Sequence, residues 1–401
     1  MRPKQLFFYA VLVALVLGFA EAAAAAACAV LVKRGWMARL PRLTDEQLRL
    51  YFTHRNPHLG WGPAVDGGGR VLRLQPRPDP AFADTVPPCA SAYGESFTAG
   101  SEVGEDGAYP HVLGVELGCR VANYGVGASG SDQALMLFRA QRHLDRAPVV
   151  ILGHISENIL RNVNQYRVLL YPDQELYIKP RFLLGGRGEL RFVPVPVRTA
   201  ADLRALPDHP ERFLAHDAFM ARPRPGFPYT WAVVRWGLRD FHVRAQLAGI
   251  PRHLPFYDAR HPAGGLALTT EILATFHRET RAEGRRPLVA LMPVGRDFVY
   301  ARRTGRWPDQ PLADALRARG VAVLHAGPEM LRRLPAGTDP CTLFADCSAH
   351  YNAAGYRLFA EVVRDRLRAD GAFTRAAAPP REAPRSPAPA GRLSGGGPSG
   401  D

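Results

Sequence analysis

Short apolar runs alternate with amphipathic segments along most of the chain from Cys89 onward. Parallel strands need long crossover connections, and these are usually helices, so this alternation predicts βαβ units. We therefore expect an α/β fold with a central parallel sheet and helices on both of its faces. The strands are expected at 89–94, 120–124, 148–153, 287–292 and 321–325.

The segment 163–262 breaks this rhythm and is rich in Arg, Pro and aromatic residues. We expect it to be an insertion, with a hairpin over 181–197 and a helix near 231–248, that covers one edge of a functional site. The helices of the main fold are expected at 109–117, 131–143, 266–282, 312–319 and 353–368.

The rest of the chain divides by composition. Residues 1–34 form an apolar anchor or signal segment, and residues 35–87 form an irregular stalk with one short helix at 44–52. Residues 88–372 form the α/β domain with its insertion. Residues 373–401 are mostly Pro, Ala, Gly, Ser and Arg, which cannot bury enough apolar surface to fold, so we expect a disordered tail.

The N-terminal run Leu6–Val32 is apolar except for Glu21. As a helix it would be about 40 Å long, enough to cross a bilayer core of about 30 Å. Three interpretations are open. The favoured one is an uncleaved transmembrane anchor; the others are a signal peptide cleaved within 22–27 and a lipoprotein signal ending at Cys28.

Four further cysteines lie in the body of the chain, at Cys89, Cys119, Cys341 and Cys347. Cys89 and Cys119 each open a strand-like run, and parallel neighbours would bring their Cα atoms to disulfide distance. Cys341 and Cys347 are close enough in sequence for a disulfide that closes one loop. Two disulfides would place the body outside the cytoplasm, periplasmic or extracellular, and secreted if the N-terminal segment is cleaved. Four buried thiols remain the alternative, and the basic residues within 33–42 favour a cytoplasmic body.

The formal net charge of +14 raises the question of a nucleic-acid partner. All but three of the 51 basic residues are arginines, a skew typical of GC-rich coding sequence. The charge is also spread along the chain, and residues 88–162 carry eight acidic against five basic residues. A nucleic-acid site would concentrate basic charge on one element, so we expect no nucleic-acid partner.

The first motif whose residues could take part in catalysis is the segment 94–100, Gly-Glu-Ser-Phe-Thr-Ala-Gly. Ser96 directly follows a predicted strand and is flanked by glycines, so it can stand on a tight turn with a free backbone N–H. A serine nucleophile needs this placement when its own N–H helps to bind the oxyanion. Taken alone, the motif is also compatible with an ordinary strand-end turn.

Three more motifs follow predicted strands or precede the last helix. Residues 123–130 are rich in small residues, so the N–H of Gly127 or Ala128 could face an oxyanion. Residues 153–158 end at Asn158, whose amide could do the same. Residues 346–355 contain Asp346 and His350, a carboxylate and a base.

Together these four motifs resemble the blocks of the SGNH hydrolases, also called GDSL esterases, in the same chain order. The resemblance covers about 89–162 and 264–370 and implies a flavodoxin-like, three-layer α/β/α fold. It implies that Ser96 is the nucleophile, that His350 is the general base and that Asp346 orients His350. The oxyanion would be held by backbone N–H groups at Ser96 and at Gly127 or Ala128, and by the side chain of Asn158.

Three positions depart from the family pattern. Glu95 stands where the family usually has Asp, and Ala128 stands nearest to the family's glycine. Asp346 lies four residues before His350 rather than three, so Asp339 is a fallback and a Ser–His dyad without Asp is also open.

The resemblance implies a membrane-anchored serine esterase that hydrolyses acyl esters, such as O-acetyl groups on cell-envelope carbohydrate. It implies no cofactor, and no Cys/His cluster with zinc-site spacing is present in the sequence, so we expect no metal. The expected partners are a small-molecule or carbohydrate ester and the membrane. Two alternatives are an O-acyltransferase that modifies an exported polysaccharide and a non-catalytic glycan-binding protein on the same fold.

Overall fold

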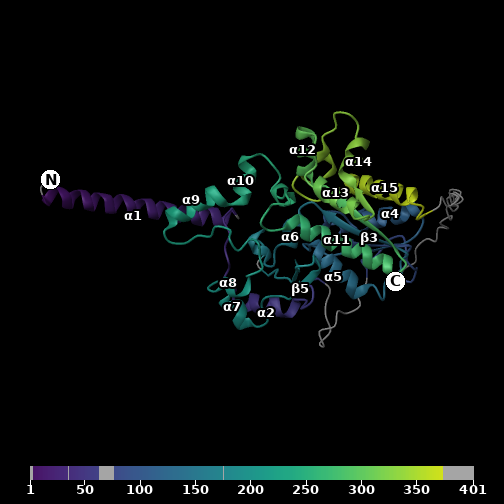
Figure 1. Ribbon diagram of the computed structural model, residues 1–401, viewed down its shortest axis with the longest axis horizontal. Coiled ribbons are helices and arrows are strands. Elements are labelled where there is room, and N and C mark those ends of the chain that lie inside the picture. The colour runs from purple at the N-terminus through teal and green to yellow at the C-terminus, as the bar shows by residue number, and fades with distance from the viewer. Residues whose placement is uncertain (1–2, 35, 63–75, 175, 374–401) are drawn as a thin grey trace, which may run out of the picture.

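The computed structural model describes residues 3–34, 36–62, 76–174 and 176–373 (Figure 1). Its centre is a five-stranded sheet in the order β2-β1-β3-β6-β7, and every neighbouring pair of strands is parallel. This confirms the predicted α/β fold, and the order is that of flavodoxin-like sheets. The strands are β1 (Ala90–Gly94), β2 (Val121–Gly125), β3 (Val149–Ile155), β6 (Arg286–Met292) and β7 (Val323–His325).

The sheet is buried on both faces, which explains why its strands read as continuous apolar runs. Along β3, Val150 and Leu152 belong to one apolar core, while Val149 and Ile151 belong to the other. The first core is closed by α5 (Ser131–Gln141), α11 (Gly265–Ala282) and α13 (Gln310–Ala318). The second is closed by α4 (Tyr109–Leu117), α12 (Gly295–Thr304), α14 (Ala326–Arg333) and α15 (Ala353–Ala369).

Helices α12 and α14 were not expected from the sequence, because each is dominated by polar residues and buries only a short apolar face. Outside the core layers, α2 (Asp45–His54) lies in the lead-in. Several short helices connect strands to loops: α3 (Ser96–Ala99), η1 (Glu105–Gly107), α6 (Asn158–Asn162), η2 (Arg167–Leu169), η3 (Leu254–Tyr257) and η4 (Pro340–Leu343).

The insertion contains the expected hairpin, an antiparallel pair of β4 (Arg181–Leu184) and β5 (Leu190–Val193). The single helix expected at 231–248 is instead two helices, α9 (Tyr229–Arg239) and α10 (Phe241–Leu247). Asp240 separates them, because its backbone is extended and its carboxylate accepts hydrogen bonds from the N–H groups of His242 and Val243. Helices α7 (Ala200–Ala205) and α8 (Pro210–Phe213) complete the insertion.

Helix α1 (Pro3–Lys33) is long and apolar enough to cross a membrane, and it extends away from the α/β body (Figure 1). Helix α9 of the insertion lies alongside its C-terminal half (Figure 1). The carboxylate of Glu21 accepts hydrogen bonds from the N–H groups of Tyr229 and Thr230 at the start of α9. The tail expected at 373–401 lies, apart from its first residue, outside the described residues.

Two disulfides join the four cysteines of the body in the predicted pairs. Cys89 is bonded to Cys119, with a Cα–Cα distance of 6.0 Å, and this bond ties together the entries of β1 and β2. Cys341 is bonded to Cys347, with a Cα–Cα distance of 4.8 Å. The second bond closes a short loop just ahead of His350.

Candidate active site

Ser96 is the first residue of α3, directly after β1, at the carboxyl edge of the sheet. Strand β1 lies between β2 and β3 in the sheet. The chain crosses from β1 to β2 on one side of β1 and then back to β3 on the other side, so this edge is the topological switch point where ligands of such sheets bind. The turn is tight: a Cβ on Gly94 would lie 2.1 Å from Thr98 Oγ1, and one on Gly125 would lie 2.2 Å from the backbone N of Ala99. Both glycines are therefore needed to seat α3 on the sheet.

His350 reaches Ser96 from the other end of the chain. Its Nε2 lies 2.7 Å from Ser96 Oγ, a hydrogen bond between residues 254 positions apart. The His350 ring packs on Phe97, with a distance of 4.9 Å between ring centroids, and 27% of its side chain is exposed. The structure thus brings together the predicted nucleophile and the predicted base in the geometry that proton transfer requires.

The acidic partner of His350 is Glu102, which was not predicted from the sequence. Glu102 Oε1 lies 3.3 Å from His350 Nδ1, on a loop where Glu102 itself has a positive φ of 73°. When Glu102 accepts a hydrogen bond from Nδ1–H, Nε2 is left as the acceptor for the Ser96 hydroxyl. This position lies outside the four motifs found in the sequence, and only the fold of the loop after α3 brings it to His350.

Asp346 was expected in that role, and the structure places it elsewhere. Its carboxylate accepts hydrogen bonds from the N–H and hydroxyl of Ser348, so it stabilises the turn that precedes His350. The extra residue between Asp346 and His350 is absorbed in this turn, where the N–H of Ala349 donates to the carbonyl of Asp346. The fallback Asp339 caps η4 through the N–H of Cys341 and does not contact His350 either.

The glycine-rich loop after β2 is held in a constrained shape. Ala128 has a φ of +60°, which costs a non-glycine residue of the order of 1 kcal/mol, so the surrounding contacts must impose it. Ser129 Oγ donates to the carbonyl of Val126, and Trp61 Nε1 donates to the carbonyl of Gly127. Because the C=O and N–H of a trans peptide point in opposite directions, the N–H of Ala128 points away from Trp61, which binds the carbonyl of Gly127. Gly127 itself is exposed.

Asn158 does not take the expected place of an oxyanion donor. Its side chain is fully buried, and Nδ2 lies 3.2 Å from both Glu95 Oε2 and Ser131 Oγ, which engage its two hydrogens. Glu95 is also fully buried, and its Oε2 takes part in this network. Asn158 therefore ties the nucleophile turn to α5, because Ser131 is the first residue of that helix.

Burial sets the electrostatics of the pair. Burial lowers the pKa of His350 below 6.5 and outweighs the hydrogen bond and charge of Glu102, which raise it. His350 is therefore neutral, and able to accept a proton, at pH 7. Burial also raises the pKa of Glu95, against the opposing charge of Arg161. Among the described residues, no group of three or more His, Cys, Asp or Glu side chains could hold a metal ion.

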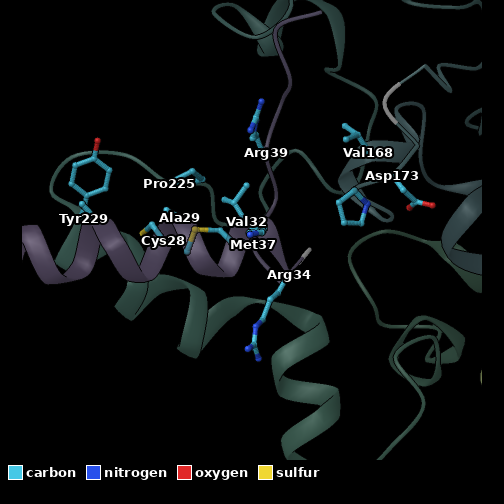
Figure 2. A pocket seen from close by; sticks show the side chains of 13 residues that line it. Cys28, Ala29, Val32, Arg34, Met37, Arg39, Val168, Asp173, Pro225 and Tyr229 are labelled. Carbon is cyan, nitrogen blue, oxygen red and sulfur yellow. The ribbon is translucent and has the colours of Figure 1, made fainter.

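A hollow lies away from this pair, between α1 and the insertion (Figure 2). Its volume is about 810 Å³, and its lining includes Cys28 and Val32 of α1 and Pro225 and Tyr229 of the insertion. Neither Ser96 nor His350 lines it. The hollow therefore lies at the contact between α1 and the insertion and is not part of the Ser–His site.

No protein-family model matches the chain, and no curated protein matches it. The chain is similar in structure to a lipolytic protein of the G-D-S-L family from Desulfitobacterium hafniense, at 11% identity and a TM-score of 0.35, over 69% of this chain and 98% of that one. It is similar to a lipase/acylhydrolase from Enterococcus faecalis, at 10% identity and a TM-score of 0.35, over 70% and 95% of the two chains.

A third similar structure is a catalytic mutant of an acetylxylan esterase from Geobacillus stearothermophilus. The identity is 13% and the TM-score 0.34, over 74% of this chain and 96% of that one. All three TM-scores lie below 0.5.

Proposed function

We propose that this protein is a serine esterase of the SGNH type that hydrolyses acyl esters. The observation that carries the proposal is the 2.7 Å contact between His350 Nε2 and Ser96 Oγ at the switch point of the sheet. A neutral imidazole in contact with a serine hydroxyl, with a carboxylate at its other nitrogen, is the arrangement that activates serine for attack on a carbonyl.

In the proposed mechanism, Ser96 Oγ attacks the carbonyl carbon of the ester while His350 Nε2 takes the hydroxyl proton. The oxyanion is held by the N–H of Ser96 and by that of Gly127 or Ala128. His350 then gives the proton to the departing alcohol, which leaves the acyl group on Ser96. Water attacks this acyl-enzyme, again with His350 as the base, and releases the carboxylic acid and free Ser96.

The substrate that we propose is an O-acyl, such as O-acetyl, ester on carbohydrate of the cell envelope. The two disulfides support a body outside the cytoplasm, where such carbohydrate is found. A hydrolase releases free acid, whereas an acyltransferase would move the acyl group to an acceptor sugar. Product analysis with an acetyl-ester donor and an acceptor glycan separates the two reactions.

Labelling by a fluorophosphonate probe tests the nucleophile directly. We expect the probe to add covalently to Ser96 in the wild-type protein and to leave Ser96→Ala unlabelled, as read from intact mass and from the modified peptide. Ser348→Ala is the matched control, because Ser348 is only two residues from His350. This variant should label fully, because Ser348 is exposed and is not the proposed nucleophile. Labelling of Ser96→Ala, or hydrolysis of a short acyl-ester panel by that variant at the wild-type rate, would exclude the proposal.

We also propose that α1 is retained as a membrane anchor. Its C-terminal half packs on α9, its Glu21 caps the first turn of α9, and Cys28 is buried with Met37 and Ala232. Cleavage within 22–27 would cut α1 in the middle of this contact. The apolar side chains Phe227, Trp231, Val234 and Leu238, at helical spacing on and before α9, are exposed in the protein, and an adjoining bilayer would cover them.

Fractionation of cells that express a C-terminally tagged protein tests the anchor. We expect the full-length mass in a membrane pellet that resists alkaline carbonate. The matched control carries a known cleavable signal peptide in place of residues 1–34 and should appear in the soluble fraction. A soluble wild-type species that begins within 22–28, or a lipid-modified N-terminus at Cys28, would contradict retention.

A further inference from the structure

Three arginines surround one aromatic ring, that of Tyr171. The guanidinium groups of Arg161, Arg167 and Arg252 lie 5.8, 4.6 and 4.5 Å from the centroid of the Tyr171 ring. They come from different elements, since Arg161 is on α6, Arg167 opens η2 and Arg252 precedes η3. Like charges repel when they are gathered in a buried place, so the cluster needs compensating negative charge.

Only one of the three arginines has an acidic partner in the described structure. Arg252 is paired with Glu157, through Nη2 at 2.9 Å from Oε2, and the Tyr171 hydroxyl also donates to Glu157. Burial raises the pKa of Glu157, but the nearby charges, that of Arg252 above all, hold this pKa below its usual range. Glu157 is thus in direct contact with Arg252, and its charge acts on Arg161 only from a distance.

Arg167 is fully buried, and both of its terminal nitrogens lack an acceptor. Only its Nε has a partner, Gln174 Oε1 at 3.1 Å. Arg161 is also buried; its Nη1 donates to the carbonyl of Ser129 at 2.9 Å, while its Nε lacks an acceptor. Burial, reinforced by repulsion from Arg161, lowers the pKa of Arg167 to about 9.

Other buried arginines show that this fold can supply acceptors to the terminal nitrogens of such groups. Arg120 donates through both terminal nitrogens to Asp84 and Val86 and lacks an acceptor only at Nε. Arg181 donates to the carbonyls of Val163, Phe182 and His216. Arg222 is paired with Asp240 and donates to two carbonyls. A buried guanidinium whose fork faces no acceptor is costly for folding, and a bound anion would satisfy it.

The position of the cluster ties it to the active site. Arg161 lies one turn after Asn158, and its Nη1 contact is with Ser129 of the glycine-rich loop. Its charge acts on His350, which contacts Ser96, and on Glu95, which precedes Ser96 in the sequence. A group held by Arg161 and Arg167 would therefore belong to the same ligand whose ester lies at Ser96.

We propose that Arg161 and Arg167 bind an anionic group, a carboxylate or a phosphate, that is carried by the ester substrate. The substrate class is then an acyl ester of an acidic carbohydrate rather than of a neutral one. This inference rests on the proposed esterase function. Guanidinium groups suit this role because their planar fork matches the oxygens of carboxylate and phosphate.

A pair of matched esters tests the substrate class: methyl O-acetyl-glucuronoside and methyl O-acetyl-glucoside. We expect the wild-type kcat/KM to be at least tenfold higher for the glucuronoside, and Arg167→Met to reduce this preference to about one. Arg167→Lys, which keeps the charge and loses the fork, should retain part of the preference and covers the case in which Arg167→Met does not fold. Arg49→Met, at an exposed arginine on α2, should keep the full preference.

Binding to Ser96→Ala separates this inference from the esterase proposal, because it needs no turnover. We expect calorimetry to show binding of methyl glucuronoside or inorganic phosphate, weaker binding of methyl glucoside, and loss of anion binding when Arg167→Met is added. Binding of methyl glucuronoside alone identifies a carboxylate ligand, and binding of phosphate alone identifies a phosphate ligand. Absence of binding by both anions would overturn the anion site, and so would equal wild-type kcat/KM for the two esters in a protein that binds methyl glucuronoside. An unlabelled Ser96 with intact anion binding would overturn only the esterase.

Discussion

Replacement of Ser96 by alanine, of His350 by glutamine, or of both at once is expected to lower kcat to one common floor. The loss should be on the order of 10⁴- to 10⁶-fold for each variant, because the nucleophile is inert without its base and the base has no function without its nucleophile. The 2.7 Å contact between the two side chains makes them a single unit. Kinetics of acetyl-ester hydrolysis with purified variants measures this loss.

The double variant decides whether Ser96 and His350 act as one unit. If Ser96 and His350 act together, the double variant should be no slower than the slower single variant. Multiplicative losses would mean that the two residues act independently, and a His350→Gln enzyme with more than a tenth of the wild-type kcat would show that another group is the base. Ser348→Ala, next to the same loop, should keep kcat within about threefold of wild type, as surface substitutions usually do.

The Ser–His pair shows what sequence patterns can predict. Ser96 follows a predicted strand and His350 precedes the last predicted helix, and the structure places both at the same edge of the parallel sheet. A parallel sheet gathers the carboxyl ends of its strands at one edge, so residues far apart in sequence converge there. The same reasoning predicted the Cys89–Cys119 disulfide, because the two cysteines open neighbouring strands.

The features that the sequence did not predict depend on side-chain direction and loop shape. Asn158 was expected to face the oxyanion, but the buried carboxylate of Glu95 engages its amide. Glu102 was missed because a loop residue with positive φ brings it to His350. The break at Asp240 was missed because apolar residues continue on both sides of it, and only the cap shows that one helix ends there. No periodic pattern carries any of this information.

Substitution of Glu102 and of Asp346 tests which carboxylate accepts the hydrogen bond from Nδ1 of His350. We expect Glu102→Gln to lower kcat by about 10- to 100-fold, less than the loss that follows from neutralising a buried triad aspartate, because 47% of the Glu102 side chain is exposed and its contact is 3.3 Å long. Asp346→Asn is the matched control and should stay within about threefold of wild type, because its carboxylate contacts Ser348 and not His350.

The pH profile of kcat/KM shows whether Glu102 acts through His350. The general base must be neutral, so activity should rise with pH through the pKa of His350, which burial places below 6.5. Glu102 raises that pKa through its hydrogen bond and its charge, so Glu102→Gln should move the acid limb of the profile to lower pH. A Glu102 with a merely structural role would lower kcat and leave the limb in place. A shift of the limb in Asp346→Asn instead would restore Asp346 as the partner of His350.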